Sequence, residues 1–348
     1  MLPKLLLERA QNETELRQRY QPLTVKRQDS EMDMKTLITG TIAGLASTLM
    51  IIFGSRLGTA GMPLVIAGAL PVYVAALSWG TVAGMAASII TIIVVSTLGS
   101  PQVAIMVGLI FTIPASVAGH QANLGQESED GVMQWYPLSK ILFNLSIMLS
   151  LALLAAGFIS GISGEKLLAA INEMARQIAH SNPQGSQFTD TQLAELAETT
   201  YRLLPFVFAG VWLVTHVLNL HVGAIISRAI GLMPRPAENI AETITLPKVI
   251  IPIMIVALLM SVVMSGGIQQ IAGVIAGISL MALALVGLAS LHVRARKMPG
   301  GIGLLVFTYL MIVLFYFPLF LFAVVGIFRV ANFQFNSSPN TPPDGDET

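Results

Sequence analysis

Long apolar stretches alternate with short polar segments along the whole chain. The apolar stretches contain no acidic residue. All 19 acidic residues fall into six clusters, at residues 8–33, 127–130, 165–173, 190–198, 238–242 and 344–347. A helix needs about 20 consecutive apolar residues to cross the hydrocarbon core of a bilayer. The pattern therefore predicts an all-α, polytopic transmembrane helical bundle with about nine spans, at 36–54, 62–79, 81–99, 102–119, 139–161, 204–226, 248–265, 268–291 and 302–328.

Three segments are too polar to lie in the membrane. Residues 1–33 are expected to be a disordered N-terminal segment, and residues 329–348, which contain three prolines and three acids, a disordered tail. Residues 162–203 are expected to form an extramembrane loop of two short amphipathic helices, capped by Ser163 and Thr189. The membrane part is thereby divided into residues 34–161, with five spans, and residues 204–328, with four.

A similar sequence occurs twice in the first half of the chain. Residues 40–52 are GTIAGLASTLMII and residues 80–92 are GTVAGMAASIITI, with six of 13 positions identical. The offset of 40 residues predicts a repeat of two spans, whose copies have the same orientation. Small residues four apart let helices approach closely. We expect such packing at Gly40 and Gly44, Gly80 and Gly84, and Gly273 and Gly277. Alternatively, these faces dock a second membrane protein.

The distribution of basic residues predicts an orientation in the lipid bilayer. Under the positive-inside rule, the N-terminus is expected to be cytoplasmic, together with the basic loops after the fourth, sixth and eighth predicted spans. The opposite side is expected to hold Arg56, Lys166, Arg176, Arg202 and Arg329.

Composition excludes several classes of function. Only 11% of the residues are charged, against about a quarter in soluble domains. The net charge is zero and no basic run is long enough to bind a nucleic acid. Without cysteine, the chain has no disulfide, thiolate nucleophile or cysteine-ligated metal. It has no Walker-type phosphate loop, and no acid within a predicted span that could relay protons.

The sixth predicted span carries the most polar candidate site. Trp212, His216 and Asn219 follow one another at i, i+4 and i+7, so they share one face of a helix. Facing lipid, they would leave hydrogen-bonding groups unsatisfied, so this face is expected to point into the bundle. There the three side chains, with Asn144 from the fifth span, are candidates to bind a small polar or aromatic ligand.

The alternative for the same face is a polar clamp between helices, with Asn144 as one partner. Each such contact stabilises a membrane protein by roughly 0.6–2 kcal/mol. No acid is placed to orient His216, so no catalytic site, metal or cofactor is expected. Pro71, Pro114, Pro252 and Pro318 are interpreted as kinks rather than as sites.

Several short strings occur in an order that resembles a known family. They are Gln134-Trp135-Tyr136-Pro137-Leu138, Leu204-Pro205, Trp212, Asn219-Leu220, Leu246-Pro247 and Leu288-Ala289-Ser290-Leu291-His292. Over about residues 34–330 the chain resembles the domain-of-unknown-function 2232 (YybS-like) family of bacterial membrane proteins, in its alphaproteobacterial form. The resemblance implies a bundle distantly similar to the substrate-binding (S) subunits of energy-coupling-factor transporters. Those subunits bind a vitamin or metal and contact a separate ATPase module through small residues on a first helix, here Gly40 and Gly44.

These observations lead to one expected function and one alternative. We expect an integral protein of the bacterial inner membrane that acts as a transporter-like, small-solute-binding subunit without its own ATPase or catalytic activity. The alternative is a membrane scaffold or assembly factor that holds other membrane proteins through its small-residue helix faces.

Overall fold

The computed structural model describes residues 34–128, 131–181 and 188–333. The helices are α2 (Met34–Arg56), α3 (Met62–Ile66), α4 (Leu70–Leu98), α5 (Pro101–Val107), α6 (Ile113–Ala122), α7 (Leu138–Ser160), α8 (Gly164–Ser181), α9 (Asp190–Ala229), α10 (Ile240–Thr243), α11 (Ile250–Val263), α12 (Gly266–Ala295), α13 (Gly301–Phe315) and α14 (Pro318–Phe333). The expected disorder of residues 1–33 lies outside the described residues, as does that of 334–348.

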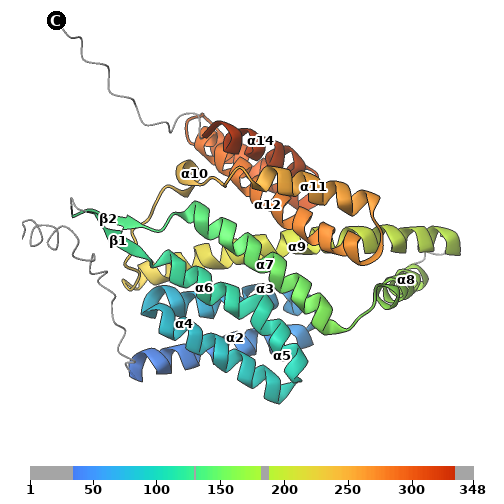
Figure 1. Ribbon diagram of the computed structural model, residues 1–348, viewed down its shortest axis with the longest axis horizontal. Coiled ribbons are helices and arrows are strands. Elements are labelled where there is room, and N and C mark those ends of the chain that lie inside the picture. The colour runs from blue at the N-terminus through green and yellow to red at the C-terminus, as the bar shows by residue number, and fades with distance from the viewer. Residues whose placement is uncertain (1–33, 129–130, 182–187, 334–348) are drawn as a thin grey trace, which may run out of the picture.

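Short irregular turns connect several helices. The 3₁₀ turns η1 (Gly58–Gly61) and η2 (Ala67–Ala69) flank α3, and the π-helical turn η3 (Gly108–Thr112) joins α5 to α6. The strands β1 (Gly125–Glu127) and β2 (Met133–Trp135) pair antiparallel, with Gln126 opposite Gln134. The fold is therefore an all-α bundle with one small hairpin at its end (Figure 1).

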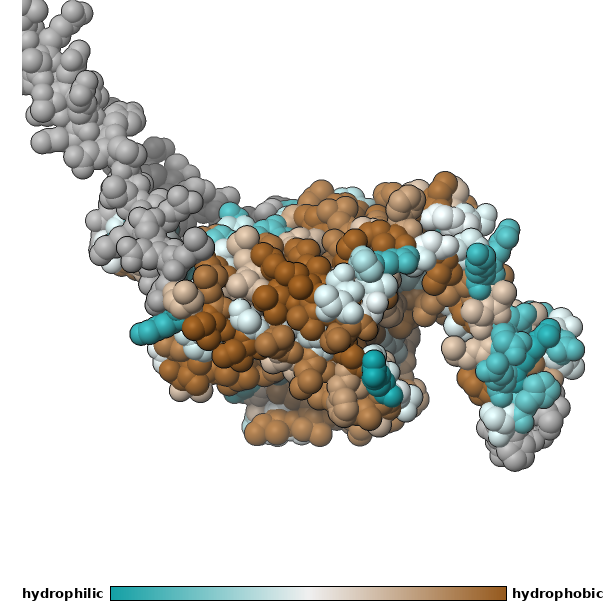
Figure 2. Space-filling view, turned by 90° about the horizontal axis from the view of Figure 1, so that it is seen from below, coloured by the Kyte–Doolittle hydropathy of each residue, from teal (hydrophilic) through white to brown (hydrophobic). Residues whose placement is uncertain are grey.

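Six segments of the described chain are long and apolar enough to cross a membrane. They are Met34–Arg56, Gly58–Leu98, Pro101–Ala122, Leu138–Ser160, Asp190–Ala229 and Gly266–Ala295. The apolar helices α11, α13 and α14 are shorter. Apolar side chains cover most of the face shown in Figure 2, and the hydrophilic surface gathers towards its ends. The chain is an integral membrane protein, but the expected count of nine spans is not confirmed.

The segment 58–98 reverses its direction at Gly80. Gly80 has φ +84°, a conformation that glycine adopts without strain. A Cβ on Gly84 would lie 2.7 Å from the Cβ of Ala76, whereas eight residues of straight helix cover about 12 Å. Residues before Gly80 run antiparallel to α2, and residues after it run parallel to α2. The reversal at Gly80 therefore falls between the predicted spans 62–79 and 81–99.

Of the six glycines expected at helix contacts, four lie against another helix and Gly84 lies against the other half of α4. A Cβ would approach the oxygen of Ala83 to 2.6 Å at Gly40, the oxygen of Ala87 to 2.5 Å at Gly44, and Pro205 to 3.0 Å at Gly273. Gly84 lies against Ala76, and Gly277 against the backbone of Phe206. Gly80 differs, because nothing lies within 4 Å of its Cβ position; its role is the reversal.

The two copies of the similar sequence lie side by side. Gly40 faces Ala83 and Gly44 faces Ala87, so α2 and the second half of α4 run parallel. A two-span repeat requires this orientation, because two passes return the chain to its starting side. The origin of the two copies by duplication stays a prediction.

The predicted last span, 302–328, is not one helix. The chain turns at Tyr316, whose φ of +53° is unusual for a bulky residue, and separates α13 from α14. Gly287 of α12 packs against Phe322, and the guanidinium of Arg329 donates to Ser290 Oγ at 3.2 Å, so α14 runs parallel to α12. The helices α13 and α14 thus form a hairpin that begins and ends on one side of the bundle.

This hairpin corrects two expectations. Arg329 lies beside Ser290 and bonds to the backbone oxygen of Glu242, so it is on the same side as Arg294 and not on the opposite one. Residues 329–333, expected in a disordered tail, belong to α14. Helices of 15 and 16 residues measure about 22–24 Å, less than the roughly 30 Å of a hydrocarbon core.

The position of Arg329 makes the charge distribution more asymmetric. We call the end of the bundle at which α2 begins the amino-terminal side; it carries α10 and the β-hairpin, and α8 lies at the other end (Figure 1). Among the described residues, its basic side chains are Lys35, Lys140, Arg228, Arg235, Lys248, Arg294, Arg296, Lys297 and Arg329. The other side has Arg56, Lys166, Arg176 and Arg202. Such a bias is typical of an asymmetrically inserted membrane protein.

The second helix of the expected extramembrane loop is longer than predicted. The capping box is confirmed, because Thr189 Oγ1 accepts from the N–H of Gln192 and the Gln192 side chain accepts from Thr189. From there α9 continues for 40 residues through the sixth predicted span. Pro205 leaves the oxygen of Tyr201 without its usual donor, and the Gln270 side chain donates to that oxygen at 3.4 Å.

Substitution of Gly277 tests the close contact between α9 and α12. In Gly277→Ala the new methyl group would collide with the Phe206 backbone, which cannot move without shifting α9. We expect the free energy of unfolding, measured in detergent, to fall by about 1–3 kcal/mol. Gly157→Ala on α7 is the control, because nothing lies within 4 Å of its Cβ position. Equal stability of the two variants would contradict the packing.

The hairpin predicts which side of the membrane each end faces. The natural chain lacks cysteine, so single cysteines can be introduced at the exposed positions Lys166, Lys297 and Asn332 and labelled with a membrane-impermeant maleimide. We expect Asn332→Cys and Lys297→Cys to be labelled from one side of sealed vesicles, and Lys166→Cys from the other. Labelling of Asn332→Cys from the Lys166 side would show a ninth full span instead.

Candidate functional site

A polar cluster inside the bundle connects three segments that are far apart in sequence. His216 on α9 is fully buried. Its Nε2 bonds to the backbone oxygen of Ile110 at 2.7 Å, and its Nδ1 lies 2.9 Å from the hydroxyl of Tyr73 on α4. A carbonyl oxygen only accepts, so Nε2 carries a proton, and the Tyr73 hydroxyl donates to Nδ1 of the neutral ring. Both ring nitrogens are satisfied within the protein.

The oxygen of Ile110 is free to accept because its helix is interrupted. In a regular helix it would bond to the N–H of residue 114, but Pro114 has no N–H. The chain there forms the π-helical turn η3, directly before α6. A buried carbonyl without a donor costs about 1–3 kcal/mol, and no water replaces the donor in a bilayer core. The His216 side chain supplies the missing hydrogen bond.

Asn219 bonds to the backbone at a second interrupted helix. Its Nδ2 donates to the oxygen of Ile66 at 2.8 Å. At the 3₁₀ turn η2 the N–H of residue 70 bonds to Ala67, three residues back, so the oxygen of Ile66 lacks its usual α-helical donor. The hydroxyl of Ser47 on α2 donates to the nearby oxygen of Gly68 at 2.5 Å. Two broken helices therefore meet one polar face of α9.

Trp212 lies one turn before His216 on the same face. Its ring stands edge-on to Phe111 and Phe208, with centroid distances of 4.6 and 5.8 Å. Nε1 of Trp212 and Oγ1 of Thr112 on η3 are among the seven buried side-chain polar atoms of the described residues that have no hydrogen-bond partner there. The expectation that this face of α9 points into the bundle is confirmed by the burial of His216 and Asn219. Its role in ligand binding stays a prediction.

Asn144 has a different partner. Its Nδ2 donates to the hydroxyl of Tyr136 at 3.1 Å, near the start of α7. Ser146, on the same helix, donates to its own backbone at Leu142. In the described chain neither side chain has a hydrogen bond to the Trp212–His216–Asn219 face, so that face is clamped by backbone oxygens and not by α7.

Sequence reasoning did not identify two partners of His216. Tyr73 stands in an apolar run of its span and has no polar neighbour at helical spacing. Ile110 contributes only its backbone oxygen, which no side-chain pattern indicates. The available signal was Pro114, since a proline within a span frees the carbonyl four residues before it.

Arg235 forms a separate buried cluster on the amino-terminal side. Its side chain is 3% exposed and pairs with Glu238 at 2.7 Å. One guanidinium nitrogen also donates to the backbone oxygens of Ala122 and Tyr136, at 3.3 and 2.9 Å. Arg235 thus connects the loop before α10 to the ends of α6 and of the β-hairpin. These partners are all internal, so the cluster is structural.

Comparisons with known proteins find no match. No protein-family model, no curated protein and no solved structure matches the chain significantly. The resemblance to the domain-of-unknown-function 2232 family stays a prediction, and so does the likeness to substrate-binding subunits. No group of three or more metal-ligating side chains occurs within the described residues. The site is therefore interpreted from its own geometry.

Removal of the Tyr73 hydroxyl tests the buried cluster. In Tyr73→Phe, Nδ1 of the fully buried His216 loses its donor, and we expect the free energy of unfolding to fall by about 1–2 kcal/mol. Tyr309→Phe is the matched control, because Tyr309 bonds to His292 at a similar distance, 2.8 Å, in an exposed place. A loss in Tyr73→Phe no larger than in this control would argue against the cluster. Thermal unfolding in detergent measures both.

Proposed function

We propose that the chain is a small-solute-binding subunit of a membrane transport system, without catalytic activity, in the bacterial inner membrane. The ligand site is the Trp212–His216–Asn219 face of α9 together with the turns η2 and η3. One observation carries the proposal: two separate spans are interrupted where they meet this face. Membrane transporters build their substrate sites from such discontinuous helices, where irregular backbone lines the binding site.

The unpartnered atoms suggest the chemistry of the ligand. Nε1 of Trp212 is a donor and Oγ1 of Thr112 can donate or accept. The rings of Trp212, Phe111 and Phe208 provide an aromatic wall. A small, planar or aromatic molecule with a hydrogen-bond acceptor fits these groups. At the level of this face the described spans supply no carboxylate that would pair with a cationic ligand, because their acidic residues lie at the start of α9.

Binding at this face would be coupled to movement of the helices. His216 and Asn219 already bond to the oxygens of Ile110 and Ile66. A ligand that takes either side chain as its partner releases one of these oxygens, and the turn that carries it must then rearrange. Coupling of this kind connects occupancy of a site to the shape of the bundle.

The energy for transport comes from another protein in this proposal. No phosphate-binding loop occurs in the sequence. The six membrane-spanning segments of the described chain carry their acidic residues only at the extramembrane start of α9, at Asp190, Glu195 and Glu198. A carboxylate relay within the membrane therefore has no candidate in the described chain.

A scaffold is the alternative, and one observation favours it. Of the residues in α13, only Gly301 and Thr308 are buried, so this helix offers apolar side chains to lipid or to a partner protein. The glycine faces of α2, α9 and α12, by contrast, are in contact with helices of the same chain. A partner would have to bind elsewhere than at Gly40 and Gly44.

The proposal is tested by isolating the ligand with the protein. The full chain is purified in mild detergent, and small molecules and proteins that co-purify are identified by mass spectrometry. We expect one enriched metabolite that raises the melting temperature of the protein. Trp212→Phe keeps an aromatic ring but removes the indole N–H donor, so we expect it to weaken binding of the metabolite by about tenfold. Trp79→Phe, outside the site, is the control.

Two results would contradict the proposal. The first is equal binding of the enriched metabolite by wild type, Trp212→Phe and Trp79→Phe, which would remove the site from α9. The second is recovery of a stoichiometric complex of membrane proteins without any enriched metabolite. That result would support the scaffold.

A further inference from the structure

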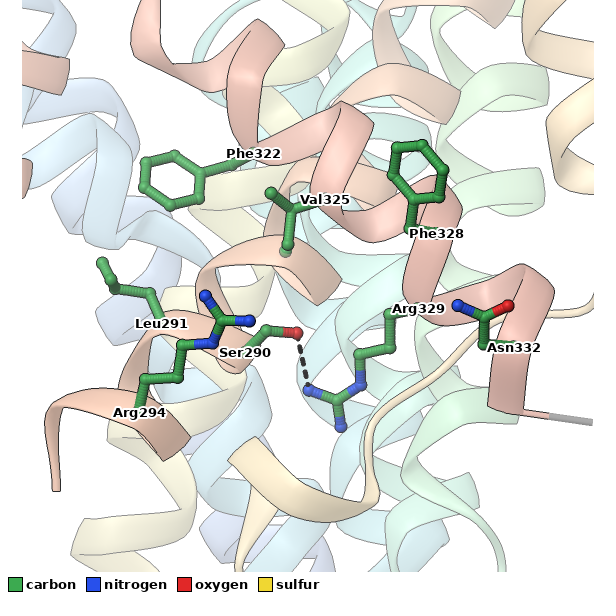
Figure 3. A pocket seen from close by; sticks show the side chains of 9 residues that line it. Ser290, Leu291, Arg294, Phe322, Val325, Phe328, Arg329 and Asn332 are labelled. Atoms are coloured by element: carbon green, nitrogen blue, oxygen red, sulfur yellow. Dashed lines mark hydrogen bonds between the residues drawn. The ribbon is translucent and has the colours of Figure 1, made fainter. Parts of the chain in front are cut away.

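A cavity of about 270 Å³ lies between α12 and α14, away from the face of α9 described above. We call it the α12–α14 pocket. Its residues are Gly287, Ser290, Leu291 and Arg294 from α12 and Phe322, Val325, Phe328, Arg329 and Asn332 from α14. Figure 3 shows the two arginine side chains on either side of Ser290, with Phe322, Val325 and Phe328 in a row along α14.

The pocket carries positive charge without a matching negative one. Arg329 donates to Ser290 Oγ at 3.2 Å and to the backbone oxygen of Glu242 at 2.8 Å. These are neutral acceptors, and a guanidinium has five N–H donors. Arg294 is exposed. In the described chain neither arginine pairs with a carboxylate, since the ion pairs there involve Arg176, Arg202 and Arg235. Two guanidiniums in one pocket favour an anion that accepts several hydrogen bonds, such as a phosphate.

The pocket lies where a membrane meets water. Arg294 stands in the last turn of α12, directly before the exposed Arg296 and Lys297. The helix α14 enters from the same side and runs towards the tip of the hairpin at Tyr316. Along α14 the residues 328, 325 and 322 therefore lead from the arginines into the apolar region.

The wall of the pocket along α14 is formed in part by the apolar side chains of Phe322, Val325 and Phe328. Phe328 is 64% exposed and Val325 42% exposed, and both continue the line that begins at the guanidiniums. An inorganic phosphate would leave this wall uncovered, whereas an acyl chain would cover it.

We propose that the α12–α14 pocket binds an anionic phospholipid. Its phosphate lies between Arg294 and Arg329, and an acyl chain follows Phe328, Val325 and Phe322 towards the centre of the bilayer. Basic pockets between membrane helices, at the side richer in Lys and Arg, are known to bind the head groups of anionic lipids. The charge distribution places this pocket on that side.

The test compares two lipids that differ in charge. The full chain in mild detergent is mixed with equal amounts of phosphatidylglycerol and phosphatidylcholine of the same acyl chains, and bound lipids are counted by native mass spectrometry. We expect wild type to retain phosphatidylglycerol preferentially. The side chain of Arg294 makes no hydrogen bond within the described chain. In Arg294→Gln we expect the preference for phosphatidylglycerol to fall by about tenfold, because one charge-assisted contact to phosphate is lost.

The controls separate this site from general electrostatic attraction and from a free anion. Lys297→Gln removes the same charge one turn away, outside the pocket, and should keep the wild-type preference. Soluble glycerol 3-phosphate, at the same concentration as the lipid, should not displace it. The proposal is overturned if wild type binds both lipids equally, if Lys297→Gln loses as much as Arg294→Gln, or if glycerol 3-phosphate displaces the lipid.

Discussion

A backbone carbonyl inside a membrane must find a donor within the protein, and this constraint organises the bundle. Several interruptions leave such an oxygen without its α-helical donor, and a side chain from another element bonds to it. His216 serves Ile110, Asn219 serves Ile66, and Asn123 donates to Ala76 and Leu77 before the reversal at Gly80. Because these donors come from helices far along the chain, the breaks hold the bundle together instead of weakening it.

The same bonds make the face of α9 both a structural element and a candidate site. A polar stripe that only clamps helices would have all of its atoms satisfied, and His216 and Asn219 meet that description. Nε1 of Trp212 does not. The face therefore combines a satisfied part, which fixes its position, with an unsatisfied donor next to it, where the proposed ligand would bind.

The pattern of apolar and polar positions was enough to predict an all-α membrane protein. It also predicted that the Trp212–His216–Asn219 face points into the bundle. The pattern failed where the chain is equally apolar on both sides of a break between two helices. Nothing in the hydropathy of 302–328 indicates the turn at Tyr316, and a break there changes the side on which Arg329 lies. The partners of the polar face were not predicted either, since Pro114 marks a freed carbonyl but does not indicate which side chain bonds to it. Asn144, similar in type, bonds instead to the hydroxyl of Tyr136.

The hairpin of α13 and α14 has a consequence for how the protein is made. Its tip at Tyr316 and Phe317 carries no charge, so no charged loop has to be carried across the bilayer for it to enter. The two helices can therefore enter the membrane as a pair from the side on which α12 ends. Gly287 of α12 and Gly326 of α14 let these two helices approach closely. Docking of α14 on α12 then requires no charged segment to cross the bilayer.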